Sequence, residues 1–89
     1  MYTRAFIEFL GTALVVGAVA FTQSPLLVVA AYAIAIAFGG KISGGHFNPA
    51  ITVWSIAKGT VGMQRGMTYL LAQFAAAAVV FMMSSIVSV

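Results

Sequence analysis

The sequence contains no cysteine and no aspartate, and Glu8 is its single acidic residue. The absence of cysteine excludes disulfide bonds and thiolate metal sites. One histidine and one carboxylate supply neither a pair of catalytic acids, nor an activated nucleophile, nor a set of metal ligands. We therefore expect neither an enzyme nor a bound metal or cofactor. The four basic residues are too few and too widely separated for a nucleic-acid surface, so no nucleic-acid partner is expected.

What the sequence has in excess is apolar side chains. They make up 63% of the 89 residues, charged residues make up 6%, and the mean hydropathy is +1.13. A soluble domain of this length cannot bury so much apolar surface, so the chain is predicted to be an integral, multi-pass protein of the lipid bilayer. A bilayer core of ~30 Å requires about 20 helical residues. Three apolar runs meet this length, at about 4–22, 24–40 and 66–88.

The first apolar run has an alternative interpretation as a cleaved signal peptide. Arg4 would be its charged start, and Ala18-Val19-Ala20 would be its small-residue cleavage site. Glu8 lies inside the apolar part of this run and argues against a signal peptide. The polar residues 22–25 predict a tight turn, because Pro25 fits the first position of a new helix. The first two runs are therefore predicted to form a hairpin of two spans.

The stretch between the second and third runs contains glycines and an Asn-Pro pair. Gly39 and Gly40 are expected to end the second helix. A new helix of ten residues is predicted next, because Asn48 can cap its start, Pro49 fits its first position and Gly59 fits its end. Ten residues rise about 15 Å, half of the bilayer core.

A helix of ten residues is too short to span the bilayer, and its side chains are too apolar for it to lie in water. We therefore predict that residues at about 41–58 form a re-entrant loop and half-helix. Gly44 and Gly45 allow the tight path, and their carbonyls need a water-filled cavity at that depth. An ordinary surface loop followed by an interfacial helix is the alternative. The predicted fold class is an all-α membrane protein with three transmembrane helices plus one re-entrant half-helix.

Three motifs in this order resemble the N-terminal repeat of the aquaporin, or major intrinsic protein, family. They are Glu8-x-x-Gly11-Thr12 in the first span, SGGHFNPA at 43–50 with the first Asn-Pro-Ala (NPA) motif, and Ala72-Gln73 in the third span. Residues 1–89 correspond to a single aquaporin-like repeat, whereas family members carry two repeats in inverted orientation. The resemblance implies one repeat of the aquaporin-like inverted-repeat fold, and so half of a channel.

The resemblance also implies which residues line a pore. Asn48 would direct its amide NH₂ into the lumen, where the positive end of the half-helix repels cations. The loop carbonyls would accept hydrogen bonds from water. The filter position counted back from Asn48 falls on Val28, which leaves more room for glycerol than an aromatic ring, and a slip of one residue moves it to Leu27 or Val29. The residues expected to line the pore are Gly44, Gly45, His46, Asn48, Pro49, Ala50 and Val28.

Each of these roles has a simpler alternative. Asn48 could act only as a helix cap, and the ring of His46 could pack against the loop rather than line the pore. The resemblance makes Glu8 a loop anchor that accepts hydrogen bonds from the loop backbone. Otherwise Glu8 would reach the membrane edge or pair with Arg4, four residues before it.

The function that the resemblance implies is a passive transmembrane channel for water, and for glycerol or other small uncharged solutes. It requires assembly with a complementary inverted half-repeat, and by family resemblance the pores form a tetramer. The alternative is a non-conducting, truncated channel half that acts only as a membrane-embedded structural module. The apolar end of the chain at Val89 favours this alternative.

The placement of basic residues predicts an orientation. In the three-span arrangement all four lie on one side, and the turn at 22–25 on the other side has none. This bias predicts a cytoplasmic N-terminus and an external C-terminus. A chain with one fixed orientation does not supply its own inverted copy, so pores made of two identical chains are expected to be rare or absent. The basic residues concerned are Arg4, Lys41, Lys58 and Arg65.

Overall fold

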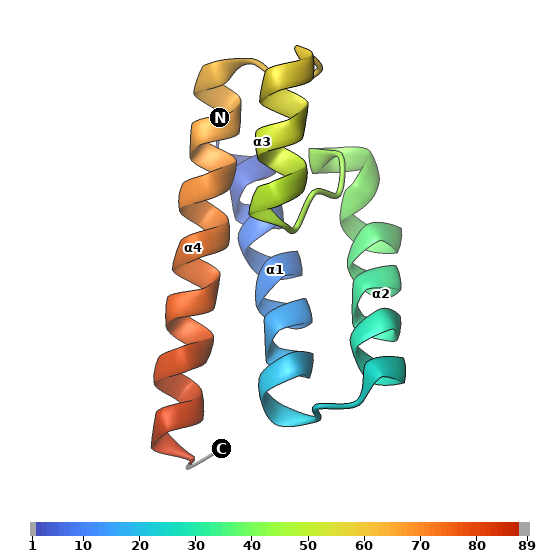
Figure 1. The fold of residues 1–89 in the computed structure, drawn as a ribbon, viewed down its shortest axis with the longest axis vertical. Helices are drawn as coiled ribbons and strands as arrows, with labels where there is room; N and C mark the ends of the chain where they lie inside the picture. The colour runs from blue at the N-terminus through green and yellow to red at the C-terminus, as the bar shows by residue number, and fades with distance from the viewer. Residues whose placement is uncertain (1, 88–89) are drawn as a thin grey trace.

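The computed structural model describes residues 2–87, and its helices are α1 (Thr3–Phe21), α2 (Pro25–Ser43), α3 (Pro49–Lys58) and α4 (Met63–Ile86) (Figure 1). α1, α2 and α4 are each long and apolar enough to cross a membrane, whereas α3 has 10 residues. The predicted fold class is therefore confirmed. Residue 88, at which the third span is predicted to end, lies outside the described residues, as do Met1 and Val89.

The helices pack around α1, which contacts both α2 and α4, while α3 packs against α4. In Figure 1 the start of α1, the end of α3 and the start of α4 lie toward the top of the molecule. The turn between α1 and α2 and the end of α4 lie at the bottom. The loop from Gly44 to Asn48 descends from the end of α2, and α3 then runs back to the top (Figure 1). This segment therefore enters and leaves on one side, as a re-entrant segment does.

α2 is longer than the sequence predicts, since it continues to Ser43 rather than ending near residue 40. The expectation that Gly39 and Gly40 end this helix is wrong. The helix ends at Gly44, which adopts the left-handed conformation with φ 96° and donates its N–H to the Gly40 carbonyl. The 19 residues of α2 rise about 28 Å, which is sufficient for a bilayer core.

Gly39 allows close packing rather than a chain break. A Cβ atom added there would lie 2.6 Å from Cγ2 of Ile7 and 3.2 Å from the ring of Phe47. The missing side chain therefore lets α1 and the loop approach α2 closely. These contacts offset the cost of about 1 kcal/mol for glycine inside a helix.

The ends of the two other spans, α1 and α4, lie close to their predicted positions. α1 begins and ends within one residue of 4–22. α4 begins at Met63 rather than at residue 66, because Gly66 is already helical and donates its N–H to the Gly62 carbonyl at 2.9 Å. A side chain at Gly66 would overlap Ile56, so this glycine lets α3 and α4 pack closely.

The interior contains small and polar side chains, while the large apolar ones lie mainly outside. The buried apolar side chains in the interior include Ala31, Ala35, Ala76 and Val80. The exposed large apolar side chains include Leu26, Leu71, Phe81 and Ile86. This distribution suits helices whose solvent is lipid, because apolar side chains gain little by leaving lipid and small residues allow close helix packing.

Candidate functional site: the re-entrant loop and the start of α3

The re-entrant loop turns on left-handed backbone conformations. Gly44 and Gly45 have φ of 96° and 68°, which glycine adopts without strain. Phe47 has φ 53°, which is uncommon for a residue with a side chain. Its ring is 3% exposed and lies between α1 and α2, where a methyl group added at Gly11 would overlap it. The packing of Phe47 between the two helices therefore holds the loop in this path.

The side chain of Glu8 joins the loop to α1 and α4. It is 0% exposed. Its Oε1 accepts hydrogen bonds from the backbone N–H of Phe47 at 2.7 Å and from Nε2 of Gln73 at 3.0 Å. Its Oε2 accepts from Oγ of Ser43 at 2.7 Å and from the backbone N–H of His46 at 3.1 Å. Glu8 is thus a fully buried acceptor for the loop backbone rather than an exposed side chain.

A second layer of hydrogen bonds connects the loop with α3 and α4. Nε2 of Gln73 donates to Oγ1 of Thr52 at 2.8 Å, and that oxygen lies 2.9 Å from Nδ1 of His46. The His46 ring packs edge-on against Tyr69 with ring centroids 5.1 Å apart, and the Tyr69 hydroxyl donates to the Ser43 carbonyl. The His46 side chain is 8% exposed. Its ring therefore packs inside the protein.

Asn48 caps α3 at the open side of the loop. Its Oδ1 accepts from the backbone N–H of Ala50 at 2.8 Å, and Pro49 occupies the first helical position. The Asn48 side chain is exposed, and its Nδ2 has no hydrogen-bond partner within residues 2–87. Ala50 is exposed and Pro49 is half-buried. The start of α3 thus presents an amide donor beside the positive end of its helix dipole.

Tyr32 of α2 is a further site residue, which is not predicted from the sequence. Its hydroxyl donates to the His46 carbonyl at 2.5 Å, so the protein itself occupies one of the three carbonyls expected to accept from water. Its ring also packs edge-on against Phe47, with centroids 6.2 Å apart. The available signal is that Tyr32 carries the only polar side-chain group between residues 26 and 38. A hydroxyl group inside a span needs a hydrogen-bond partner.

Three further residues hold the loop and are also not predicted from the sequence. Thr52 could be found from helical periodicity, because it shares the buried face of α3 with Ser55. Ser43 and Tyr69 have no comparable local signal, since the two residues are 26 positions apart in the chain.

Val28 lies apart from the other predicted pore residues. It is half-buried, one helical turn before Tyr32, and lines an open hollow beside the turn between α1 and α2. Val19, Pro25 and Val29 line the same hollow. The structure therefore brings six of the seven predicted lining residues together in one segment, with Val28 closer to the opposite end of α2.

Comparison with known families finds a match along almost the whole chain, since the family model described as major intrinsic protein matches residues 1–88. The chain belongs to the major intrinsic protein family. As a member of this family with three membrane-span helices, it is an integral membrane protein. No solved structure gives a significant match.

Curated proteins similar to the chain carry the name aquaporin. They include a probable aquaporin TIP-type from Medicago truncatula, the probable aquaporin TIP1-1 from Oryza sativa subsp. japonica and the aquaporin TIP1-2 from Musa acuminata. Each is 42% identical to the chain over 40 residues. The matched stretch covers 45% of this chain and 16% of each relative, so the chain matches a small part of the relatives' length.

Proposed function

We propose that the chain forms one half of a passive transmembrane channel for water and for small uncharged solutes such as glycerol. A complementary inverted half-repeat completes the pore, and the pores assemble as a tetramer. The observation that carries the proposal is the capped start of α3. There the side-chain oxygen of Asn48 accepts a hydrogen bond from the Ala50 N–H, and the exposed Asn48 side chain keeps its amide NH₂ free to donate. Membership of the major intrinsic protein family and the aquaporin names of the relatives support it.

A water passage that excludes cations requires positive electrostatic potential and a hydrogen-bond donor, and the start of α3 offers both. A helix N-terminus is equivalent to about +0.5 charge, so it repels cations and protons. The Asn48 amide donates to the oxygen of a passing water, whose hydrogens then turn away toward acceptors on either side. We assign these acceptors to the carbonyls of Gly44, Gly45 and His46, with the last shared with Tyr32. Pro49, Ala50 and Val28 complete the proposed lining, and Glu8 anchors it.

The width of the proposed pore depends on one face of α2. Val28 leaves space in the proposed pore that an aromatic side chain would fill. Tyr32, one turn along the same helix, places a ring against the loop. We therefore assign the discrimination between water and glycerol to these two side chains acting together.

The proposed orientation has a cytoplasmic N-terminus and an external C-terminus. Arg4 and Arg65 lie in the first turns of α1 and α4, and Lys41 and Lys58 lie in the last turns of α2 and α3. These four helix ends share one side, and the turn between α1 and α2 has no basic residue. Cytoplasmic segments carry the excess of Lys and Arg. The inverted half is therefore a different repeat, on the same or on a separate polypeptide.

A tandem fusion of two copies tests the channel. Three spans end on the side opposite to their start, so the second copy is inverted. In that copy, Arg4→Gln, Lys41→Gln, Lys58→Gln and Arg65→Gln remove the charges that oppose inversion. We expect vesicles that contain the tandem to shrink faster in stopped-flow osmotic shock than protein-free vesicles, with no increase in ion conductance. The single chain at equal protein density is the control, and its permeability should stay at background.

Reporters fused to the C-terminus, one active only in the cytoplasm and one only outside, establish the topology of both proteins. Background water permeability of a correctly oriented tandem would contradict the channel and favour the non-conducting structural module. Strong signals from both reporters on the single chain would contradict the fixed orientation and support a pore of two identical halves.

A further inference from the structure

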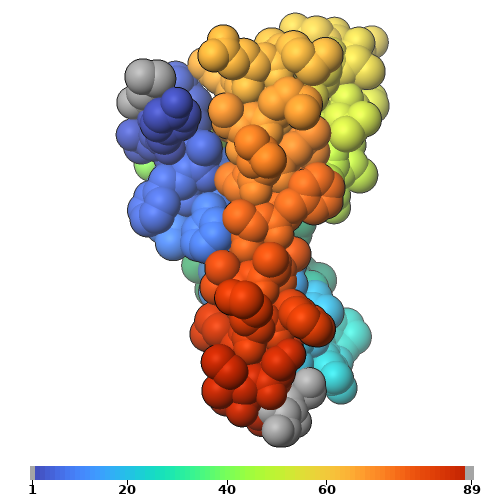
Figure 2. Space-filling view, turned by 90° about the vertical axis from the view of Figure 1, so that its left-hand side faces the viewer, coloured from blue at the N-terminus to red at the C-terminus, as the bar shows by residue number. Residues whose placement is uncertain are grey.

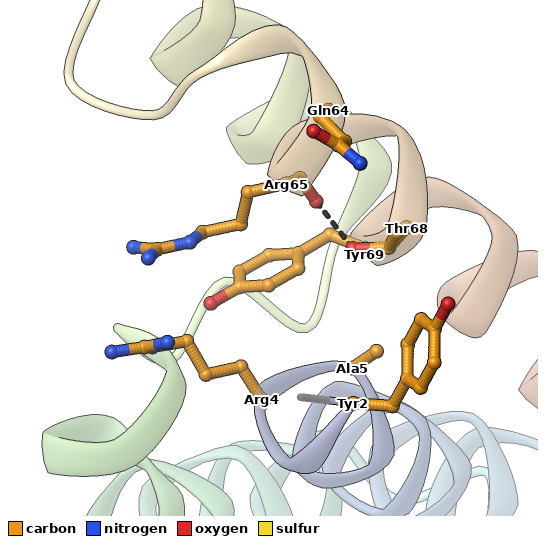
Figure 3. A pocket seen from close by; sticks show the side chains of 7 residues that line it. All are labelled: Tyr2, Arg4, Ala5, Gln64, Arg65, Thr68 and Tyr69. Atoms are coloured by element: carbon orange, nitrogen blue, oxygen red, sulfur yellow. Dashed lines mark hydrogen bonds between the residues drawn. The ribbon is translucent and has the colours of Figure 1, made fainter.

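A polar hollow of about 360 Å³ lies between the first turns of α1 and α4. Figure 3 shows Arg4 of α1 and Arg65 of α4 extending to the same side of this hollow, with the ring of Tyr69 between them. The Tyr69 hydroxyl donates to the Ser43 carbonyl, so the ring is a fixed wall. The two arginines are the charged residues among those that line the hollow.

The chain has no acidic side chain left to pair with these arginines. Glu8 is the single acidic residue, and it is buried and accepts four hydrogen bonds from other groups. Lys41 lies beside Arg4 in a neighbouring hollow and adds positive charge. This corner of the molecule thus carries positive charge that only an anion from outside the chain neutralises.

The polar hollow continues into an apolar groove of about 400 Å³ along the same seam between α1 and α4. Tyr2, Ala5 and Thr68 line both. The groove adds the apolar side chains of Phe6, Phe9, Leu71 and Ala72. Figure 2 shows this face, with the start of α1 in blue beside the first half of α4 in orange. A cationic hollow above an apolar groove, at the starts of two membrane spans, suits a phosphate group that carries acyl chains.

We propose that this site binds an anionic phospholipid, with its phosphate held by Arg4 and Arg65 and an acyl chain in the groove. A planar guanidinium group donates in pairs to phosphate oxygens, and Gln64 at the rim is a further donor. The bound lipid bridges the starts of α1 and α4, the two helices that carry Glu8 and Gln73. The site is separate from the proposed pore, so its test does not depend on conduction.

Native mass spectrometry of the chain released from micelles measures the affinity. Phosphatidylglycerol is the probe, and phosphatidylcholine and inorganic phosphate are the comparators. We expect phosphatidylglycerol to bind more tightly than either, and Arg4→Gln or Arg65→Gln to weaken it about tenfold, as expected for lost hydrogen bonds to a charged group. Lys58→Gln is the matched control, because it removes the same charge at the end of α3, outside the hollow. Its effect should stay within about twofold.

Arg4→Lys and Arg65→Lys keep the charge but lose the paired donors, so we expect intermediate affinities. If a glutamine variant loses its helical circular dichroism, the two lysine variants decide the test. Equal affinities in the arginine variants and in Lys58→Gln would overturn the site, because general surface charge would then explain the binding. Inorganic phosphate that binds as tightly as phosphatidylglycerol would overturn the assignment to a lipid.

Discussion

Replacing Glu8 by glutamine tests whether one buried carboxylate holds the re-entrant loop. Glutamine has nearly the same shape, but one of its two terminal groups is an NH₂ donor. Each Glu8 oxygen accepts two hydrogen bonds. In either orientation, the new NH₂ group therefore faces two donors. They are those of Ser43 and His46 in one orientation and those of Phe47 and Gln73 in the other.

The size of the effect follows from these bonds. A hydrogen bond to a charged group contributes about 1.5–3 kcal/mol, so the loss of two lowers the free energy of unfolding by about 3–6 kcal/mol. The Ser43 hydroxyl has a second acceptor, the Gly39 carbonyl at 3.3 Å. The backbone N–H groups of His46 and Phe47 have no such freedom to turn. We therefore expect the NH₂ group to take the place of Oε2, where Ser43 can turn to the Gly39 carbonyl and only the His46 N–H loses its acceptor, so that the loss lies in the lower half of the range.

Reversible unfolding of the chain in mixed micelles with increasing SDS measures this free energy, and hydrogen exchange reports on the amides of His46 and Phe47. The control is Gln64→Glu, the reverse exchange at an exposed position, for which we expect a change below about 1 kcal/mol. An unchanged unfolding curve for Glu8→Gln, with both amides still protected, would refute the anchoring role.

Four further substitutions test the packing of the loop, a buried hydroxyl group and two polar groups of the proposed pore. Gly11→Ala adds a methyl group that overlaps the Phe47 ring, so it should lower the free energy of unfolding by about 1–3 kcal/mol in SDS titration. Thr12→Val removes a buried hydroxyl group that has no partner within residues 2–87, and should raise that free energy by about 1 kcal/mol. Asn48→Asp keeps the cap but replaces the exposed donor with a negative charge, so cation current through the tandem should rise, and unchanged exclusion would contradict its lumen role. Tyr32→Phe frees a loop carbonyl for water, and stopped-flow permeability of the tandem should rise up to about fivefold, the equivalent of one hydrogen bond.

The ends of α3 are the part of the fold that sequence predicts best, because every signal is local. Asn48, Pro49 and Gly59 each act within a few residues of their own position. The end of α2 is different. Gly39 reads as a helix breaker in isolation, and only the approach of Ile7 from another helix makes it a packing residue. Tertiary contact decides such a boundary, and a single sequence does not reveal it.

The partners of Glu8 mark a second limit of the sequence. An acid inside a span predicts that partners exist, but these partners lie 35 to 65 residues away in the chain. The resemblance to a family indicates the loop backbone as one partner. Neither composition nor periodicity selects Ser43, and the role of Tyr32 depends on a ring that reaches from α2 to the loop.

The hydrogen bonds that hold the fold also place the proposed pore group, so we expect stability and the proposed conduction to depend on each other. Apolar contacts between helices gain little over contacts with lipid, and three of the buried apolar side chains are alanines. The polar network centred on Glu8 therefore supplies much of what specifies this arrangement. It reaches α3 at Thr52, whose backbone N–H donates to the Asn48 carbonyl at 3.1 Å. We therefore expect that loosening Glu8 displaces the start of α3, and that the tandem with Glu8→Gln loses water permeability together with stability.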